Sequence, residues 1–335
     1  MFKNKVSILI PFKDTAIYLP ECLDSIVNQS YKNWEAILVN DNSKDKSFDI
    51  VKKYTKIDSR IKLIQNQGDG IIDALQTAYQ FSNGIYITRM DSDDIMMTNK
   101  IEVMVKMLIS NGLGHISLGL VKYFSKKGIK NGYKRYEKWL NELILKGKCF
   151  DEIYKECVIP SPCWMINRND LDKAKGFNSK IYPEDYDLSF RFYKSGMKCI
   201  PANKVLHLWR DHSLRTSRNS DHYSNNSFLD LKVYYFLKLS YNRSIKLFLW
   251  GAGQKGKKVA FLLTKAKIKF TWICNNPKKI GKKIYGNKLE SWLTINKYTK
   301  YQSIITIANQ NSQNEIKKYL KLNNKVAMKD YFFFC

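Results

Sequence analysis

The chain has 335 residues, a hydrophobic fraction of 44% and a formal net charge of +27. This composition excludes a disordered chain, and the length predicts two domains. No apolar run approaches the ~20 residues of a membrane-spanning helix, no signal peptide is expected, and the seven cysteines form no CxxC pair. We therefore expect a cytoplasmic protein with reduced thiols, whose contact with a membrane would be peripheral and on its inner face.

In chain order, the N-terminal two-thirds alternates short apolar strand patterns with amphipathic helix patterns. The predicted strands are Val6–Ile10, Trp34–Val39, Ile61–Ile64 and Ile85–Thr88. The predicted helices between them are Tyr18–Ser30, Ser47–Tyr54 and Ile71–Phe81. This alternation predicts an α/β domain with a mainly parallel sheet flanked by helices. Because ligands bind beyond the carboxyl ends of strands in such sheets, the polar residues that follow each strand are the first candidates for a site.

The acidic segment Arg89-Met-Asp-Ser-Asp-Asp94 follows the fourth predicted strand directly. Its three carboxylates would repel one another in a folded site unless a cation neutralised them. In an extended segment Asp91 and Asp93 project to the same side, where they could bind Mg²⁺ or Mn²⁺ and through it a diphosphate. The alternative is an acidic turn before a helix that starts near Ile95, with Asp94 as its N-cap.

A second acidic pair, Glu184 and Asp185, opens a predicted helix after Pro183. The positive end of the helix dipole is expected to keep such a carboxylate ionised near pH 7, as a general base requires. The alternative is the acidic composition common to helix starts. Four residues apart on the same helix, Asp187 and Arg191 are expected to form an ion pair.

Asp41 and His212 are two further polar candidates. Asp41 follows the second strand, where it could accept the imide N–H of a uracil-type base or could form an Asx-turn. His212, in Trp209-Arg-Asp-His212, could complete a metal site through a neutral imidazole nitrogen, or could be an ordinary hydrogen-bonded histidine. A structural role is the interpretation for the other histidines, His115, His207 and His222.

A second α/β pattern begins after a predicted helix at Phe228–Leu239. The predicted strands are Ile245–Trp250, Phe270–Ile273 and Ile304–Ala308, and the first is followed by a predicted helix at Lys257–Lys265. The turn Gly251-x-Gly253-x-x-Gly256 lies between that strand and helix, the context of a dinucleotide-binding fingerprint. If this module binds a cofactor, Gly251, Gly253 and Gly256 would hold it.

NAD is nevertheless disfavoured as a cofactor of this module. The acidic residue expected ~20 positions after the fingerprint is missing, since Cys274-Asn-Asn276 stands there. An alternative function, an NAD-dependent sugar-nucleotide oxidoreductase or epimerase, would need a Tyr-x-x-x-Lys pair, but Tyr298 is followed by Gln302. A structural or interaction role is the preferred interpretation.

Taken together, the N-terminal segments resemble glycosyltransferase family 2, whose members are inverting enzymes of the GT-A fold. The resemblance extends over residues 4 to 225 and rests on segments that occur in the family's order, namely the strand with Pro11, Ser25–Ser43, Gly70–Leu75, Arg89–Asp94, Glu184–Arg191 and Trp209–His212. It implies a GT-A nucleotide-diphospho-sugar transferase domain at 1–225, a helical linker at 226–243 and a Rossmann-like domain at 244–335. The last is similar to the extension of some bacterial members.

The resemblance also implies a role for each matching residue. Donor binding would involve Pro11, Asp41, Arg89, Asp91 and Asp93. Asp91, Asp93 and His212 would hold a divalent Mg²⁺ or Mn²⁺. Asp185 would be the catalytic base, with Glu184 beside it. The implied reaction transfers a sugar from a nucleotide-diphosphate sugar, with UDP favoured by Asp41, to a glycan or lipid-linked acceptor in cell-surface polysaccharide synthesis.

Two segments of the chain depart from the family pattern. Asn40 and Asn42 flank Asp41 where the family often has Asp-Asp-Gly, and Ser161 stands where we expect a histidine.

The positive charge is unevenly distributed along the chain. From residue 246 onward lysines greatly outnumber acidic residues, which is compatible with contact to an anionic membrane or an acidic glycan. A nucleic-acid partner is not expected, because it would explain the charge but not the carboxylates.

Overall fold

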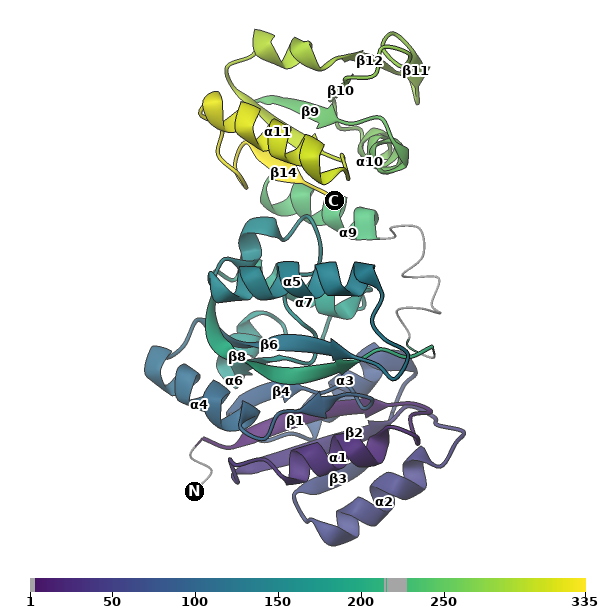
Figure 1. Cartoon of the computed structure of the whole chain (residues 1–335), viewed down its shortest axis with the longest axis vertical. Coiled ribbons are helices and arrows are strands. Elements are labelled where there is room, and N and C mark those ends of the chain that lie inside the picture. Colours follow the sequence, from purple (N-terminus) through teal and green to yellow (C-terminus); the bar gives the residue numbers. More distant parts are fainter. Residues whose placement is uncertain (1–3, 214, 216–227) are drawn as a thin grey trace. The chain divides into compact units, whose positions relative to one another are not determined.

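The computed structural model describes residues 4–213, 215 and 228–335 (Figure 1). The chain divides into two compact units, each with its own sheet. Unit 1 consists of Met1–Cys149 and Val158–Arg215, and unit 2 consists of Phe150–Cys157 and Thr216–Cys335. The short segment Phe150–Cys157 thus joins the C-terminal unit, although the sequence placed it within the first domain.

Unit 1 is built on a mixed eight-stranded sheet in the order β3-β2-β1-β4-β7-β6-β8-β5. Its strands are β1 (Val6–Phe12), β2 (Trp34–Asn40), β3 (Ile61–Gln65), β4 (Tyr86–Arg89), β5 (Ile95–Met96), β6 (His115–Phe124), β7 (Trp164–Asn167) and β8 (Lys198–Arg210). The pairs among β1 to β4 are parallel, as is β6 with β8, whereas β7 and β5 pair antiparallel to their neighbours. The structure confirms the predicted α/β sheet and adds β6, β7 and β8.

Helices flank this sheet on the chain segments between its strands (Figure 1). They are α1 (Leu19–Val27), α2 (Ser47–Ile57), α3 (Gly70–Gln80), α4 (Lys100–Asn111), α5 (Asn131–Leu145), α6 (Arg168–Lys173) and α7 (Glu184–Lys194). The 3₁₀ turn η1 (Cys149–Glu152) continues into the segment that belongs to unit 2. Every residue of β1 and β2 is buried, as expected for parallel strands covered on both faces. The core of unit 1 therefore lies along these central strands.

The parallel strands bring three chain segments to one edge of the sheet. The amide of Asp41, just after β2, donates to the carbonyl of Phe12 at the end of β1, at 2.9 Å. The amide of Met90, just after β4, donates to the carbonyl of Leu9 in β1, at 3.0 Å. The residues that follow β1, β2 and β4 consequently meet at their common carboxyl ends, where ligands of such sheets bind.

Unit 2 contains a six-stranded sheet in the order β11-β12-β10-β9-β13-β14. The strands are β9 (Lys246–Trp250), β10 (Thr271–Cys274), β11 (Lys283–Ile284), β12 (Asn287–Ser291), β13 (Tyr301–Ile305) and β14 (Tyr331–Phe333); its helices are α9 (Phe228–Leu239), α10 (Gln254–Lys265) and α11 (Gln310–Leu322), with a 3₁₀ segment, η3, at Trp292–Lys297. Of the strand pairs in this sheet, β11 with β12 is antiparallel and the others are parallel. The structure confirms a second, Rossmann-like α/β fold.

Two of the three glycines in the glycine-rich turn of unit 2 are required by close packing. Gly251 has φ +120°, in the region that side chains disfavour, and Gly253 is the N-cap of α10. A Cβ on Gly256 would lie 2.1 Å from the carbonyl oxygen of Gly251, so α10 could not approach β9 with any larger residue there. These contacts account for Gly251 and Gly256, whereas a Cβ on Gly253 would meet no atom within 4 Å.

Two further properties concern the cysteines and the helices of the described residues. All seven cysteines are free thiols. Within residues 4–213, 215 and 228–335, no helix combines the length and apolar character needed to cross a bilayer.

The alternative interpretation of the acidic segment, a turn that caps a following helix, was wrong. The sequence placed a helix start near Ile95 with Asp94 as its N-cap, but Ile95 and Met96 form the short strand β5, and α4 begins only at Lys100 with Asn99 as its N-cap. Asp94 is instead 1% exposed and is held by side-chain and backbone groups of β8. Burial inside unit 1, and not helix capping, explains this residue.

Candidate active site

The acidic segment after β4 forms a tight turn. The amide of Asp94 donates to the carbonyl of Asp91 at 3.2 Å, so the segment is not the extended chain that the sequence predicted. Asp91 Oδ1 accepts from Arg89 Nε at 3.1 Å, whereas Asp93 Oδ2 lies 2.8 Å from His212 Nε2. The two carboxylates therefore have different partners.

Arg89 joins this turn to the start of α7. Its guanidinium Nη1 donates to Glu184 Oε1 at 2.8 Å while Nε donates to Asp91, and the side chain is 9% exposed. Burial opposes the charge of Arg89, but Asp91, Glu184 and Asp185 outweigh it and raise the pKa of the guanidinium. Arg89 is thus a permanent cation among three carboxylates, which places the predicted acidic segments in one site.

Asp185 lies next to this cluster, in the first turn of α7. Its Oδ1 accepts from the amide of Tyr186 at 2.7 Å. Burial and then the neighbouring charge of Glu184 raise the pKa of Asp185 to about 7, although Arg89 acts in the opposite direction. The helix dipole was expected to keep this carboxylate ionised, but burial and like charge outweigh it. A carboxyl group with a pKa near 7 can accept or donate a proton at neutral pH.

His212 and Asp93 place an imidazole and a carboxylate side by side. Tyr18 packs against the His212 ring, with a centroid distance of 4.4 Å. The second ring nitrogen, Nδ1, is buried and has no hydrogen-bond partner in the described part of the chain. A carboxylate oxygen and an imidazole nitrogen are donors that Mg²⁺ or Mn²⁺ accept, so these two residues fit a divalent ion.

The same described residues contain no group of three or more His, Cys, Asp or Glu arranged to hold a metal. Asp91, which the resemblance also assigns to the ion, is bonded to Arg89. An ion at Asp93 and His212 would therefore complete its coordination with water or with phosphate oxygens of a ligand, as Mg²⁺ commonly does.

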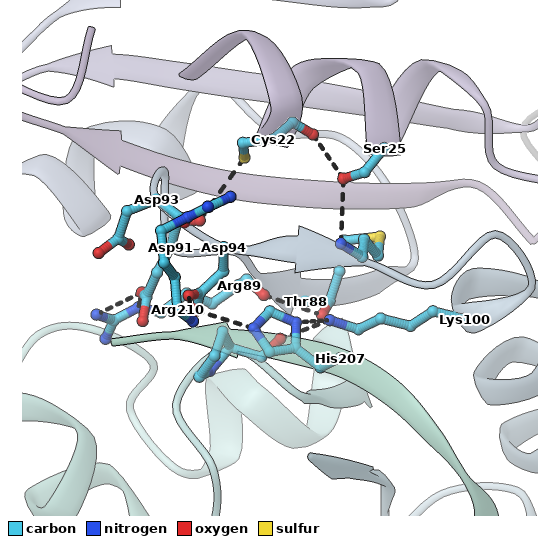
Figure 2. A network of polar contacts seen from close by, with 12 residues as sticks. Cys22, Ser25, Thr88, Arg89, Asp91, Asp93, Asp94, Lys100, His207 and Arg210 are labelled. Atoms are coloured by element: carbon cyan, nitrogen blue, oxygen red, sulfur yellow. Dashed lines mark hydrogen bonds and ion pairs between the residues drawn. The ribbon is translucent and has the colours of Figure 1, made fainter. Parts of the chain in front are cut away.

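Below the turn lies a buried polar network, shown in Figure 2. Lys100 Nζ donates to the carbonyl of Pro162 at 2.5 Å and lies 3.4 Å from His207 Nδ1, and His207 Nε2 lies 2.9 Å from Asp94 Oδ2. Because an ammonium group can only donate, Nδ1 accepts and Nε2 carries the proton that is donated to Asp94. Burial, with Lys100 and Arg215, lowers the pKa of His207 well below its ordinary value, so the ring is neutral.

Arg210, at the end of β8, holds the turn from the other side. Its backbone amide donates to Asp94 Oδ1 at 2.7 Å, and its Nε donates to the carbonyl of Asp93 at 2.6 Å. Its Nη2 pairs with Glu21 of α1 at 2.5 Å. Neither Arg210 nor Lys100 was among the predicted site residues. Arg210 lies inside the segment Trp209–His212 that carries the resemblance, but its partners and those of Lys100 come from distant parts of the sequence.

Asp41 lies in a separate part of the same sheet edge. Its Oδ1 accepts from Asn66 Nδ2 at 2.7 Å and from the amide of Gly70 at 2.9 Å, and Lys13 Nζ lies 3.6 Å from Oδ2. The Asx-type contact of this loop is made by Asn40, whose Oδ1 accepts from the amide of Ser43. Asp41 is therefore fixed by long-range contacts, with one oxygen beside a cation.

The edge at Asp41 is tied to the acidic turn through the loop after β1. Thr15 in that loop has its hydroxyl 3.1 Å from the hydroxyl of Ser92, inside the turn. Pro11, another predicted donor-binding residue, is buried within β1 beside Val39 of β2. Pro11 thus lies near the end of the strand that precedes this loop.

A small pocket borders Arg89, Glu184 and Asp185. Its other walls are largely apolar, and the lining residues are Ile159, Ser161, Trp164, Phe177, Leu188, Ser189 and Phe192. Two buried polar atoms of this pocket, Ser161 Oγ and Glu184 Oε2, have no hydrogen-bond partner among the described residues. Unsatisfied buried groups are costly, so this pair is prepared for a polar ligand group or a water.

The sequence of the chain matches the family model "Glycosyl transferase family 2" over residues 7–174, which is half of the chain. The chain belongs to glycosyl transferase family 2. The acidic turn after β4 and, apart from Val6, the strands β1 to β4 lie within the matched residues. The protein is therefore a glycosyltransferase enzyme.

Curated relatives agree with this family 2 assignment. Glycosyltransferase GlyA of Streptococcus pneumoniae is 28% identical over 219 residues, which cover 62% of this chain but only 30% of GlyA. An uncharacterised glycosyltransferase of Haemophilus influenzae is 29% identical over 246 residues, 70% of this chain and 75% of that protein. Among solved structures, S. aureus TarS 1–349 in complex with UDP-GlcNAc has a TM-score of 0.55 at 15% identity, covering 77% of this chain and 71% of that one, so it shares the fold.

Proposed function

We propose that this enzyme transfers a sugar from a UDP-sugar to a hydroxyl group of a glycan or lipid-linked acceptor with inversion, in cell-surface polysaccharide synthesis. The observation that carries the proposal is the joining of Asp91, Arg89 and Glu184 into one ion-pair chain beside Asp185. The reaction requires phosphate binding and proton transfer. The ion pairs bring Arg89, a cation suited to phosphate, into the same cluster as Asp185, a carboxyl group suited to proton transfer.

Asp185 is the proposed catalytic base. Its carboxylate would take the proton of the acceptor hydroxyl as the oxygen attacks the anomeric carbon from the face opposite the diphosphate. A single displacement of this kind inverts the anomeric configuration. The pKa of about 7 supports the role, because a base works best when its pKa lies near the working pH.

The donor would lie along the carboxyl ends of β1, β2 and β4. Asp41 would receive the base N–H on the oxygen that faces away from Asn66, after displacement of the nearby Lys13. Arg89 supplies a fixed positive charge near the diphosphate. Asp93 and His212 would hold a divalent cation, which when bound neutralises charge on the departing diphosphate.

The pocket beside Asp185 is the proposed place of a sugar hydroxyl. A hydroxyl can donate one hydrogen bond and accept another, so it can donate to Glu184 Oε2 and accept from Ser161 Oγ at once. Both orphaned atoms would then be satisfied.

The test is a calorimetric titration of the full chain with UDP-sugars, GDP-sugars and NAD, each with and without Mn²⁺. We expect binding of one nucleotide sugar that depends on Mn²⁺ and is weakened at least about tenfold in Asp93→Asn and in His212→Ala. Asp172→Asn, an exposed carboxylate of α6 bonded to Tyr79, is the matched control and should bind as the unchanged chain does. Binding of NAD but of no nucleotide sugar would contradict the proposal.

A further inference from the structure

The chain between Asp230 and Glu290 contains lysines but no acidic residue. This stretch includes α10 and the β11–β12 hairpin of unit 2. Lysines scattered over a surface are usually balanced by nearby carboxylates, but here the sequence offers none for almost sixty positions. The structure shows where these lysines gather and what they surround.

One face of α10 carries lysines on both sides of an exposed aromatic ring. Lys257, Phe261 and Lys265 are spaced four residues apart, so they lie on the same side of the helix. Both lysines are exposed, and Phe261 is 44% exposed. An exposed phenylalanine between two lysines is not explained by the packing of unit 2.

The β11–β12 hairpin adds a second exposed ring to the same face. Its two-residue turn consists of Tyr285 and Gly286, both with positive φ, and Tyr285 is 48% exposed. The ring of Tyr285 packs edge-on against Phe261 with a centroid distance of 5.7 Å, and Asn287 Nδ2 donates to Thr264 Oγ1 of α10 at 3.2 Å. The hairpin and the helix therefore form one continuous surface.

The exposed lysines of the hairpin extend the positive charge around this aromatic pair. We define the aromatic–lysine surface by its two rings and its exposed lysines: Phe261, Tyr285, Lys257, Lys265, Lys283 and Lys288. Lys258, which also lies on this part of α10, forms an ion pair with Asp230 at 3.1 Å and is left out of the definition.

We propose that the aromatic–lysine surface binds the anionic face of a lipid bilayer. Aromatic side chains favour the interface between headgroups and hydrocarbon, and lysines around them attract anionic headgroups, each by about fivefold in affinity. An acidic polysaccharide would match the lysines but would leave two apolar rings without a partner that buries them. An anionic bilayer would bury the two rings and would also attract the four lysines.

The proposal concerns unit 2 alone and does not rest on the proposed sugar-transfer chemistry. All residues of the surface belong to α10 and the adjoining hairpin, far along the sequence from Asp93 and Asp185. Loss of membrane binding would therefore leave donor binding in solution unchanged, and loss of donor binding would leave membrane binding unchanged.

The experiment is co-sedimentation of the full chain with vesicles of phosphatidylcholine alone and of phosphatidylcholine with phosphatidylglycerol. We expect binding only to the second kind, and its loss in high salt, since exposed charges are screened. The double variant Phe261→Ser/Tyr285→Ser should bind at least about tenfold more weakly with an unchanged thermal midpoint, since both rings are exposed. The triple variant Lys257→Glu/Lys265→Glu/Lys283→Glu should not bind.

A matched triple variant separates this surface from net charge. Lys300, Lys318 and Lys321 are exposed lysines elsewhere in unit 2, and their replacement by Glu changes the net charge by the same amount. This control should retain binding. Equal weakening of both triple variants, absence of binding by the unchanged chain, or competition by heparin or DNA that is unaffected by the aromatic substitutions would overturn the proposal.

Discussion

Replacing Glu184 by Gln tests the assignment of Asp185 as the base through the pH dependence of the rate. The charge of Glu184 helps to raise the pKa of Asp185 to about 7, while Arg89 lowers it. Glu184→Gln removes the like charge and also frees Arg89 from its ion pair, so both changes lower the pKa of Asp185. The rate should then reach half its maximum at a lower pH.

The size of the effect follows from the ionised fraction of the base. With a pKa of about 7, the carboxylate is about 9% ionised at pH 6 and about 91% at pH 8, so the rate of the unchanged enzyme should rise about tenfold across this range. If the substitution lowers the pKa by about 1, the ionised fraction at pH 6 rises about fivefold. The rate at pH 6, relative to the plateau of the same variant, should rise by that factor.

The assay measures release of the nucleoside diphosphate from the bound donor, with water as the acceptor, as kcat/KM against pH. Arg89→Met is the control that should shift the pH midpoint in the opposite direction. Loss of this cation should raise the pKa of Asp185 and move the midpoint above that of the unchanged enzyme. Profiles are compared after normalisation to each plateau, so a general loss of activity does not affect the outcome. Midpoints that stay in place in both variants would refute Asp185 as the titrating base.

Substitutions at three positions test other parts of the account. Asp185→Asn should lower transfer by about 10²–10⁴-fold while Mn²⁺-dependent donor binding, measured by calorimetry, stays within twofold or so. His207→Gln, whose amide nitrogen can still reach Asp94, should keep more donor affinity than His207→Asn, whose shorter amide reaches only the Lys100 side; equal donor KM values for the two would show that the contact does not hold the acidic turn. Gly256→Ala should destabilise the fold by about 1–3 kcal/mol, seen as a lower thermal midpoint, because its Cβ would meet the Gly251 carbonyl.

Much of the fold could be predicted because the central strands carry their signal locally. β1 and β2 are largely apolar and are buried along their whole length, and α9 spans the same residues as the helix predicted there. β8 escaped prediction because it is long, contains Pro201 and mixes buried with exposed positions, so neither strand pattern applies to it throughout. β6 and β7 also depend on pairing with distant strands for their identity.

The same contrast holds for the site: some of its residues are marked by local sequence, whereas its contacts join distant residues. The acidic turn after β4 and the acidic start of α7 are visible in short stretches of sequence. The ion pair between Arg89 and Glu184 joins residues 95 positions apart, and the partners of Asp94 lie more than 100 positions away. Burial of Asp185 within the folded unit and the charge of the adjacent Glu184 raise its pKa, so the helix dipole alone gave the wrong direction for this pKa.

The most direct test of the account is a crystal structure of the full chain with a bound UDP-sugar and Mn²⁺. We expect the base at Asp41, the metal between Asp93 and His212, and the anomeric carbon beside Asp185, with a sugar hydroxyl between Ser161 and Glu184. A nucleotide found instead at the Gly251–Gly256 turn, with nothing bound at the carboxyl ends of β1, β2 and β4, would contradict the claim that these scattered carboxylates form one sugar-transfer site.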